Sequence, residues 1–127
     1  MRGVTEPISL TTALASFAEL WSPRIVTRVN DYDIRVAKVR GAHIWHTHDH
    51  TDEFFLVLDG ELTIALRDRT VVLQRGDVFT VPRGTEHKPS SEDGASILMV
   101  EPTGTVTVGD QHEGVPDHVD ATTGHAL

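Results

Sequence analysis

The segment "HTHDHTDEFFLVLDGEL", His46–Leu62, carries most of the information on fold and chemistry. Histidines alternate with other residues at its start, Glu53 follows them, and an apolar run then leads to an Asp-Gly pair. Residues i and i+2 of a β-strand point to the same face, with their side chains adjacent. The imidazoles of His46 and His48 are therefore predicted to converge on one point.

The dipeptide Asp59-Gly60 predicts a β-hairpin with a two-residue turn. Such a turn pairs Val57 with Leu62, and directly opposed residues share a face of the sheet. The predicted inner wall consists of Glu53, Phe55, Val57, Leu62, Ile64 and Leu66. Glu53 is the one carboxylate in this apolar wall, and a buried carboxylate is costly unless it is paired, hydrogen-bonded, protonated or bound to a metal.

The opposite face of the same segment is also apolar, because it presents Phe54, Leu56 and Leu58. An apolar stripe of this kind is unfavourable in open water. We therefore expect a homodimer in which a second copy of the chain covers the stripe.

Two stretches resemble the motifs of the cupin family. "GAHIWHTHDHTDEFFLVLDG", Gly41–Gly60, is similar to the first cupin motif, with four residues instead of five between its Gly and its His-x-His. "GDVFTVPRGTEH", Gly76–His87, is similar to the second motif, although the usual later Asn is Ser91 here. Two motifs in this order are far more specific than His-x-His alone.

The resemblance covers about residues 33–101 and implies an all-β fold, a jelly-roll (double-stranded β-helix) barrel with an interior metal. The stretch looks closest to compact one-domain, type 2 cupins described as mannose-6-phosphate isomerase-like or RmlC-like. Carried over to this chain, the metal ligands are His46, His48, Glu53 and His87. The alternation and the inner wall support the first three, and Pro82 and Gly84 shape a turn that delivers His87.

Three imidazoles and one carboxylate predict one divalent metal ion per chain, which could be Fe, Mn, Ni, Co or Zn. In an octahedral ion two positions remain for water or substrate. The sequence therefore favours an enzyme that acts on a small, oxygen-rich metabolite by isomerase, cyclase or dioxygenase chemistry. A non-catalytic binding or sensing module and a purely structural metal remain the alternatives.

No catalytic residue is singled out by spacing. The acid and base candidates near the motifs are His50, Asp49, Asp52, Tyr32 and Glu86. The candidates for lining a pocket are Trp45, Phe55, Phe79 and Met99. Strand parity predicts that His43 lies on the surface, opposite to His46. Residues His112, His118 and His125 fall in a polar segment and suit no compact ligand set.

The composition excludes several classes of partner. A formal net charge of -8, from 19 acidic and 11 basic residues, disfavours nucleic acid and anionic membranes as partners. The chain has no cysteine, so any metal must be held by histidine and carboxylate. Because the start of the sequence has no apolar run of signal-peptide length, we expect a cytoplasmic protein.

Three regions are predicted within the 127 residues. Residues 1–23 contain an amphipathic helix with its apolar side chains at Leu10, Leu14, Phe17 and Trp21, ended by Ser22-Pro23. Residues 24–101 form the barrel, and residues 102–127 form a polar surface tail with one short strand at Thr105–Val108. Strands are predicted near 24–29, 33–40, 43–48, 53–58, 61–67, 70–74, 78–81, 86–91 and 95–101.

Overall fold

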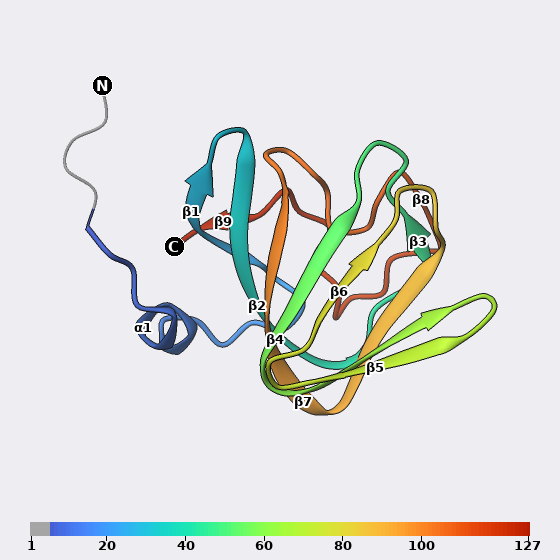
Figure 1. The fold of residues 1–127 in the computed structure, drawn as a ribbon, viewed down its shortest axis with the longest axis horizontal. Coiled ribbons are helices and arrows are strands. Elements are labelled where there is room, and N and C mark those ends of the chain that lie inside the picture. Colours follow the sequence, from blue (N-terminus) through green and yellow to red (C-terminus); the bar gives the residue numbers. More distant parts are fainter. Residues whose placement is uncertain (1–5) are drawn as a thin grey trace.

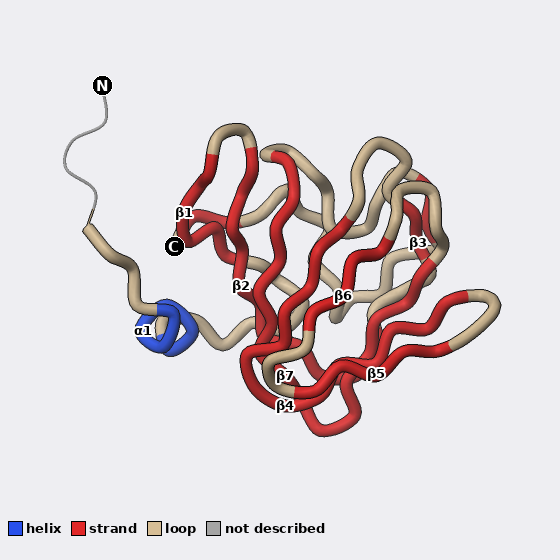
Figure 2. The backbone as a smooth tube through the Cα atoms, in the orientation of Figure 1, coloured by secondary structure: helices blue, strands red, loops and turns tan. Residues whose placement is uncertain are grey.

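The computed structural model describes residues 6–127, and this part of the chain is all-β apart from one short helix (Figure 1). The elements are α1 Leu10–Ala15, β1 Arg24–Val29, β2 Tyr32–Ala42, β3 His46–Thr47, β4 Glu53–Leu66, β5 Thr70–Gln74, β6 Val78–Val81, β7 His87–Pro102, β8 Gln111–His112 and β9 His125–Ala126. The predicted all-β class is confirmed. Figure 2 shows the strands, in red, curving around a common interior.

The described strands belong to one nine-stranded sheet in the order β5-β4-β7-β2-β1-β9. Strand β6 pairs with β4 beside this path, and β3 pairs with both β7 and β8. The long strand β7 therefore lies between β2 and β4, antiparallel to both. Because β5 and β9 lie at opposite ends of this order and do not pair with each other, the sheet is not closed. Its strands are nevertheless strongly curved (Figure 2).

The predicted hairpin at Asp59-Gly60 is wrong, because β4 runs through this dipeptide as one bent strand. Gly60 has a φ of 80°, and a Cβ atom there would clash with the carbonyl oxygen of Gly94. Strand β7 bends at the same corner, where Gly60 pairs with Ala95. The Asp-Gly pair is typical of a tight turn, but here the positive φ of Gly60 produces a bend within one continuous strand.

The inner wall derived from that hairpin nevertheless forms. Val57 and Leu62 are five residues apart, so in a regular strand they would point to opposite faces. The pairing of β4 with β7 shifts register between Val57 and Asp59 and again between Gly60 and Thr63. These irregularities return Leu62 to the buried face. The buried residues of this wall are Glu53, Phe55, Val57, Leu62 and Ile64.

The helix that forms is shorter than the one predicted from the apolar side chains between Leu10 and Trp21. Helix α1 begins after the N-cap Ser9 and ends at Ala15, and the Ser16 hydroxyl donates to the carbonyl of Ala13 at 2.7 Å. Trp21 is buried without being helical, and its indole N–H donates to the carbonyl oxygen of Arg40 at 2.9 Å. The last turns of the predicted helix, up to Trp21, do not form, and this part of the chain contacts β2 instead. No helix within residues 6–127 has the length and apolarity needed to cross a membrane.

The C-terminal segment packs against the sheet instead of lying loosely on its surface. The strand expected at Thr105–Val108 is absent from the described structure; instead β8 pairs with β3, and β9 pairs in parallel with β1. Val108 and Val119 are buried in the core cluster. The description of this segment as a surface tail was therefore wrong for these residues. The three-part division of the chain itself remains a prediction.

Candidate metal centre

Three short segments bring the four predicted ligands together inside the sheet. His46 lies in β3, His48 follows it directly, and Glu53 and His87 are the first residues of β4 and β7. His46 and His87 are also paired across β3 and β7. All four side chains are buried, and one donor atom from each lies within 4.8 Å of the others. We call His46, His48, Glu53 and His87 the donor cluster.

Backbone carbonyls orient two of the imidazoles. The Nδ1 atom of His46 lies 2.8 Å from the carbonyl oxygen of Ile44, and Nδ1 of His87 lies 2.9 Å from that of Thr85. A ring whose Nδ1–H donates to a carbonyl keeps the lone pair of Nε2 for a ligand. Nε2 of His87 is 3.1 Å from Oε1 of Glu53, so the free nitrogen points toward the carboxylate.

The donor cluster has the residue types of a metal site, and one of its nitrogen atoms lacks a hydrogen-bond partner among the described residues. Nε2 of His48 lies 3.1 Å from Oε2 of Glu53, but it makes no hydrogen bond with any described residue. An unpartnered buried nitrogen beside a buried carboxylate is destabilising in isolation. A divalent cation would satisfy both groups, and these ligand types suit first-row metals.

Burial and mutual contact set the charges of the donor cluster. Burial, with a smaller effect of the neighbouring His87, lowers the pKa of His46 to about 3. Burial also acts to lower the pKa of His48, but the charge of the Glu53 carboxylate, 3.1 Å away, raises the pKa overall. Burial acts to raise the pKa of Glu53, and the two histidines beside it bring that pKa well below its ordinary value. His46 is thus neutral and Glu53 ionised, as metal ligation requires.

A cavity of about 30 Å³ adjoins the donor cluster on its inner side. His46 and Glu53 contribute to its wall, as do the predicted lining residues Phe55 and Met99. A second, more polar groove of about 450 Å³ lies against the other side of His46, and Trp45 lines this groove instead. The donor cluster is therefore bordered by space on two sides.

The prediction that His43 lies on the surface was wrong. Its side chain is buried, and its ring centroid lies 4.7 Å from that of His46 and 5.2 Å from that of Trp21. Strand parity failed because β2 ends at Ala42 and the next strand begins only at His46. Burial lowers the pKa of His43 to about 4, so this neighbour of the donor cluster is uncharged at neutral pH.

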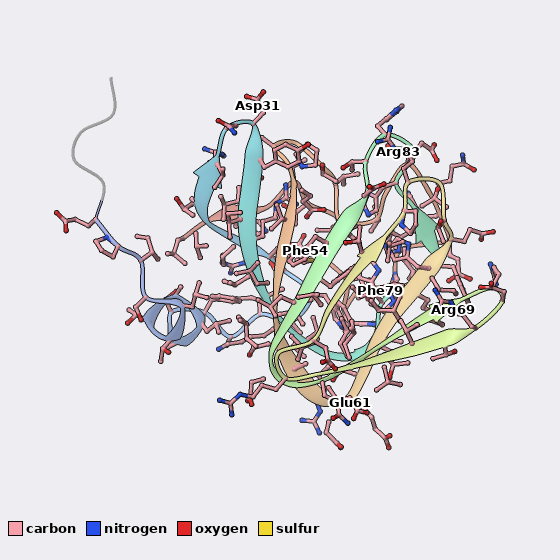
Figure 3. The ribbon with its side chains drawn as sticks, viewed as in Figure 1. Asp31, Phe54, Glu61, Arg69, Phe79 and Arg83 are labelled. Atoms are coloured by element: carbon pink, nitrogen blue, oxygen red, sulfur yellow. The ribbon has the colours of Figure 1, made fainter. Side chains whose placement is uncertain are left out.

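The acid and base candidates do not line the inner cavity. Asp49 and Glu86 line the outer groove, where Glu86 also pairs with Arg67 at 2.9 Å. Asp52 accepts a hydrogen bond from the backbone N–H of Arg83, which lies at the outer rim of the sheet in Figure 3. His50 and Tyr32 are exposed.

The three C-terminal histidines lie outside the donor cluster. His112 is paired with His46 in the β3–β8 ladder, yet its side chain is exposed, and its Nδ1 lies near the carbonyl of Glu113. His118 approaches the carbonyl of Ala42 instead.

A second buried polar group was missed in the sequence. Asp33, Arg35 and Glu101, here called the ion cluster, are almost fully buried. Arg35 pairs with both acids, at 2.8 Å in each case. Burial and the charge of Glu53 raise the pKa of Glu101 well above its ordinary value. Alternation along β7 could have predicted the position of Glu101, because it shares parity with the buried Ile97 and Met99.

A curved antiparallel sheet with a buried three-His, one-Glu set inside it defines a class: β-barrel-like proteins with a candidate mononuclear metal site. The chain belongs to the cupin family, because the family model described as "Cupin domain" matches residues 34–101. The resemblance inferred from the two motifs is therefore confirmed.

Known proteins are similar to this chain in sequence or in fold. It is 40% identical over 77 residues to the uncharacterized protein YdbB of Bacillus subtilis (strain 168), covering 60% of this chain and 68% of YdbB. The crystal structure of a cupin-2 domain containing protein from Shewanella frigidimarina NCIMB 400 has a TM-score of 0.74 and 40% identity, over 75% of this chain and 93% of that one. Hydroquinone 1,2-dioxygenase from Sphingomonas sp. TTNP3, solved with 4-hydroxybenzoate bound, has a TM-score of 0.62 over 80% and 84% of the two chains; at 20% identity it shares the fold alone.

Proposed function

We propose that the donor cluster binds one divalent metal ion and that the chain is an enzyme acting there on a small, oxygen-bearing molecule. The observation that carries this proposal is the convergence of four buried donors, with Nε2 of His48 left without a hydrogen bond from any described residue. A bound ion would polarise an oxygen atom of the substrate. Iron, manganese, nickel, cobalt and zinc all accept such ligands.

Access to the donor cluster supports an active rather than a purely structural ion. A structural metal is closed off by protein ligands, whereas a catalytic metal keeps a position open. The inner cavity has both His46 and Glu53 in its wall, so a small molecule seated there would reach the donor atoms. Isomerase, cyclase and dioxygenase chemistry would all use such an ion, and the likeness to a dioxygenase is one of fold alone.

The metal itself is tested with a double variant. His46→Ala combined with His48→Ala removes two of four ligands, so we expect elemental analysis to find about one divalent ion per wild-type chain and none in the variant. His112→Ala is the matched control, because this histidine is exposed and lies outside the donor cluster. Full metal occupancy in the double variant would refute the proposed site.

Turnover separates the enzyme from a non-catalytic binding module. Glu53→Gln keeps the shape of the side chain but removes its charge, so it should lower turnover more than it lowers stability. We would screen metal-loaded wild type and the variant against hydroxy acids, enediols and sugars. Ligands that perturb the spectrum of a cobalt-loaded chain without being converted by any metal form would identify a binding module instead.

We also propose the homodimer expected from the apolar outer face. Phe54, Leu56 and Leu58 are only half-buried in one chain, and the exposed Val78 is paired with Leu56 on the same face. Covering this face would remove apolar surface from water. Light scattering at micromolar concentration should give twice the chain mass, and a monomer would contradict the proposal. The cytoplasmic location remains a prediction of the sequence.

A further inference from the structure

Residues 106–113, here called the C-terminal segment, lie against the short strand that contributes His46 to the donor cluster. Strand β8 belongs to this segment and pairs with β3, which places Gln111 opposite Thr47 (Figure 1). The segment is outside residues 34–101, which the family model matches. Val108 anchors it, because this side chain is buried in the core cluster. The C-terminal segment is thus a fixed part of the sheet beside the donor cluster.

Hydrogen bonds from the C-terminal segment hold the backbone on both sides of His46. The N–H of Trp45 donates to Oε1 of Glu113 at 3.1 Å, and the N–H of Glu113 donates to the carbonyl oxygen of Trp45 at 3.2 Å. On the other side of His46, the N–H of Asp110 donates to the carbonyl oxygen of Thr47 at 2.8 Å. Strand β3 is only two residues long and makes a single pair with β7. The C-terminal segment therefore sets the position of β3 along one of its two edges.

The same segment also binds the residue that follows His48. Oδ2 of Asp110 accepts a hydrogen bond from the N–H of Asp49 at 2.7 Å. The Asp49 side chain accepts in turn from Nε2 of Gln111 at 3.2 Å. The backbone around both histidines of this stretch is thus bonded to the C-terminal segment.

Gly109 brings the C-terminal segment into contact with the imidazole of His46 itself. Gly109 is buried and has a φ of 72°, a conformation that residues with a side chain rarely adopt. A Cβ atom at this position would overlap the carbonyl oxygen of Thr47 and lie 3.2 Å from Cδ2 of His46. The absence of a side chain therefore allows the segment to pack against a ring whose Nδ1 already lies 2.8 Å from the carbonyl oxygen of Ile44.

We infer that Gly109 is a positioning residue of the metal centre. It allows the C-terminal segment to support β3 and the His46 imidazole from the edge opposite to β7. Neighbours that fix the orientation of a ligating histidine commonly change metal affinity by about 10–100-fold. The inference rests on the proposed function for the metal, but the contacts that orient His46 are present without it.

The test compares two glycine-to-alanine variants of the whole chain. Gly104 also has a positive φ, 91°, but a Cβ atom there would have no described atom within 4 Å. Both variants therefore strain the backbone, and only Gly109→Ala also presses a methyl group against β3. In titrations with cobalt(II), Gly109→Ala should bind the metal about 10–100-fold more weakly than the wild type, and Gly104→Ala should stay within about twofold.

A second readout needs no metal. In NMR spectra of the metal-free chain, each histidine gives a signal from its Cδ2–H group, and the His46 signal is the one lost in His46→Gln. Gly109→Ala should shift this signal, because the new methyl group approaches that carbon atom, whereas Gly104→Ala should leave it in place. A general loss of stability would not shift the His46 signal selectively, so this measurement separates positioning from a purely structural role.

Asp110 supplies a second pair of variants, which decides if Gly109→Ala does not fold. Asp110→Ala removes the acceptor of the Asp49 N–H and should weaken cobalt binding about fivefold, the effect of one lost hydrogen bond. Asp110→Asn keeps an acceptor oxygen of the same reach and should retain most of the affinity. The same NMR comparison of the His46 signal applies to these two variants.

Where the wild type binds cobalt, equal affinities of the two glycine variants would overturn the inference and leave the proposed function standing. An unmoved His46 signal in Gly109→Ala would overturn it as well, with or without metal. A wild type that binds no cobalt refutes the proposed function, and the His46 signal then decides the role of Gly109 alone. If Gly109→Ala does not fold, equal behaviour of the two Asp110 variants would overturn the inference.

Discussion

The interior contains two buried polar clusters that differ in one respect. The ion cluster includes its own cation, Arg35, which binds both of its carboxylates. The donor cluster has a carboxylate and three imidazoles but no permanent cation. Buried charges persist in proteins when they are paired or coordinate a metal. The ion cluster is thus nearly complete within the chain, and the donor cluster is completed by an ion from outside.

The largest expected effect comes from removing the cation of the ion cluster. Arg35→Met removes the cation that pairs with Glu101 and one of the two cations that pair with Asp33, so it should lower the free energy of unfolding by about 3–5 kcal/mol, measured by urea denaturation. Arg28→Met is the control, because Arg28 also pairs with Asp33 but is itself 47% exposed, and should cost less than about 1 kcal/mol. Equal stability of the two variants would show that the ion cluster does not depend on Arg35.

A smaller effect should follow from supplying the missing cation to the donor cluster. Zinc at about one hundred times its dissociation constant should raise the free energy of unfolding by about 2.7 kcal/mol, provided that it binds only the folded chain. Asp33→Asn should retain this increase and the His46→Ala, His48→Ala double variant should lose it. Thermal unfolding with and without chelator measures both, and an increase that survives in the double variant would place the metal elsewhere.

The smallest effect concerns pH in the metal-free chain. The pKa of His43 is about 4 in the folded state, below its ordinary 6.5. The unfolded chain therefore binds a proton between these values that the folded chain does not, and stability falls as the pH is lowered. His43→Phe should reduce the loss of unfolding free energy between pH 7 and pH 5 by about 2 kcal/mol. Denaturation curves at both pH values test this, and an unchanged pH dependence would contradict it.

Three members of the donor cluster could be predicted because their spacing in the sequence is local, and the fourth, His87, came from the resemblance to the second cupin motif. His46 and His48 are separated by a single residue, and Glu53 and His87 each begin a strand next to a turn or loop. Alternation also indicates that Glu101 points inward with Met99. What the sequence could not supply was the link between Glu101 and Arg35, which are 66 residues apart.

The errors arose where a local pattern has two structural outcomes. Asp59-Gly60 suits a hairpin, but it equally suits a strand bend, and the approach of Gly94 from β7 selects the bend. Parity misplaced His43 because the strand had already ended at Ala42. The apolar stripe up to Trp21 predicted more helix than forms, because contacts with β2 override the helical spacing.

The position of β7 between β2 and β4 also governs the order of folding. Its pairs join residues distant in sequence, such as Tyr32 with Pro102 and Leu66 with His87. Contacts of this kind pay the entropy of closing a long loop before they add stability, and sheets built from them fold slowly, in milliseconds to seconds. Because His87 is the first residue of β7, the fourth ligand arrives only with this strand. Refolding of the sheet and the capacity to bind metal should therefore appear in the same kinetic phase.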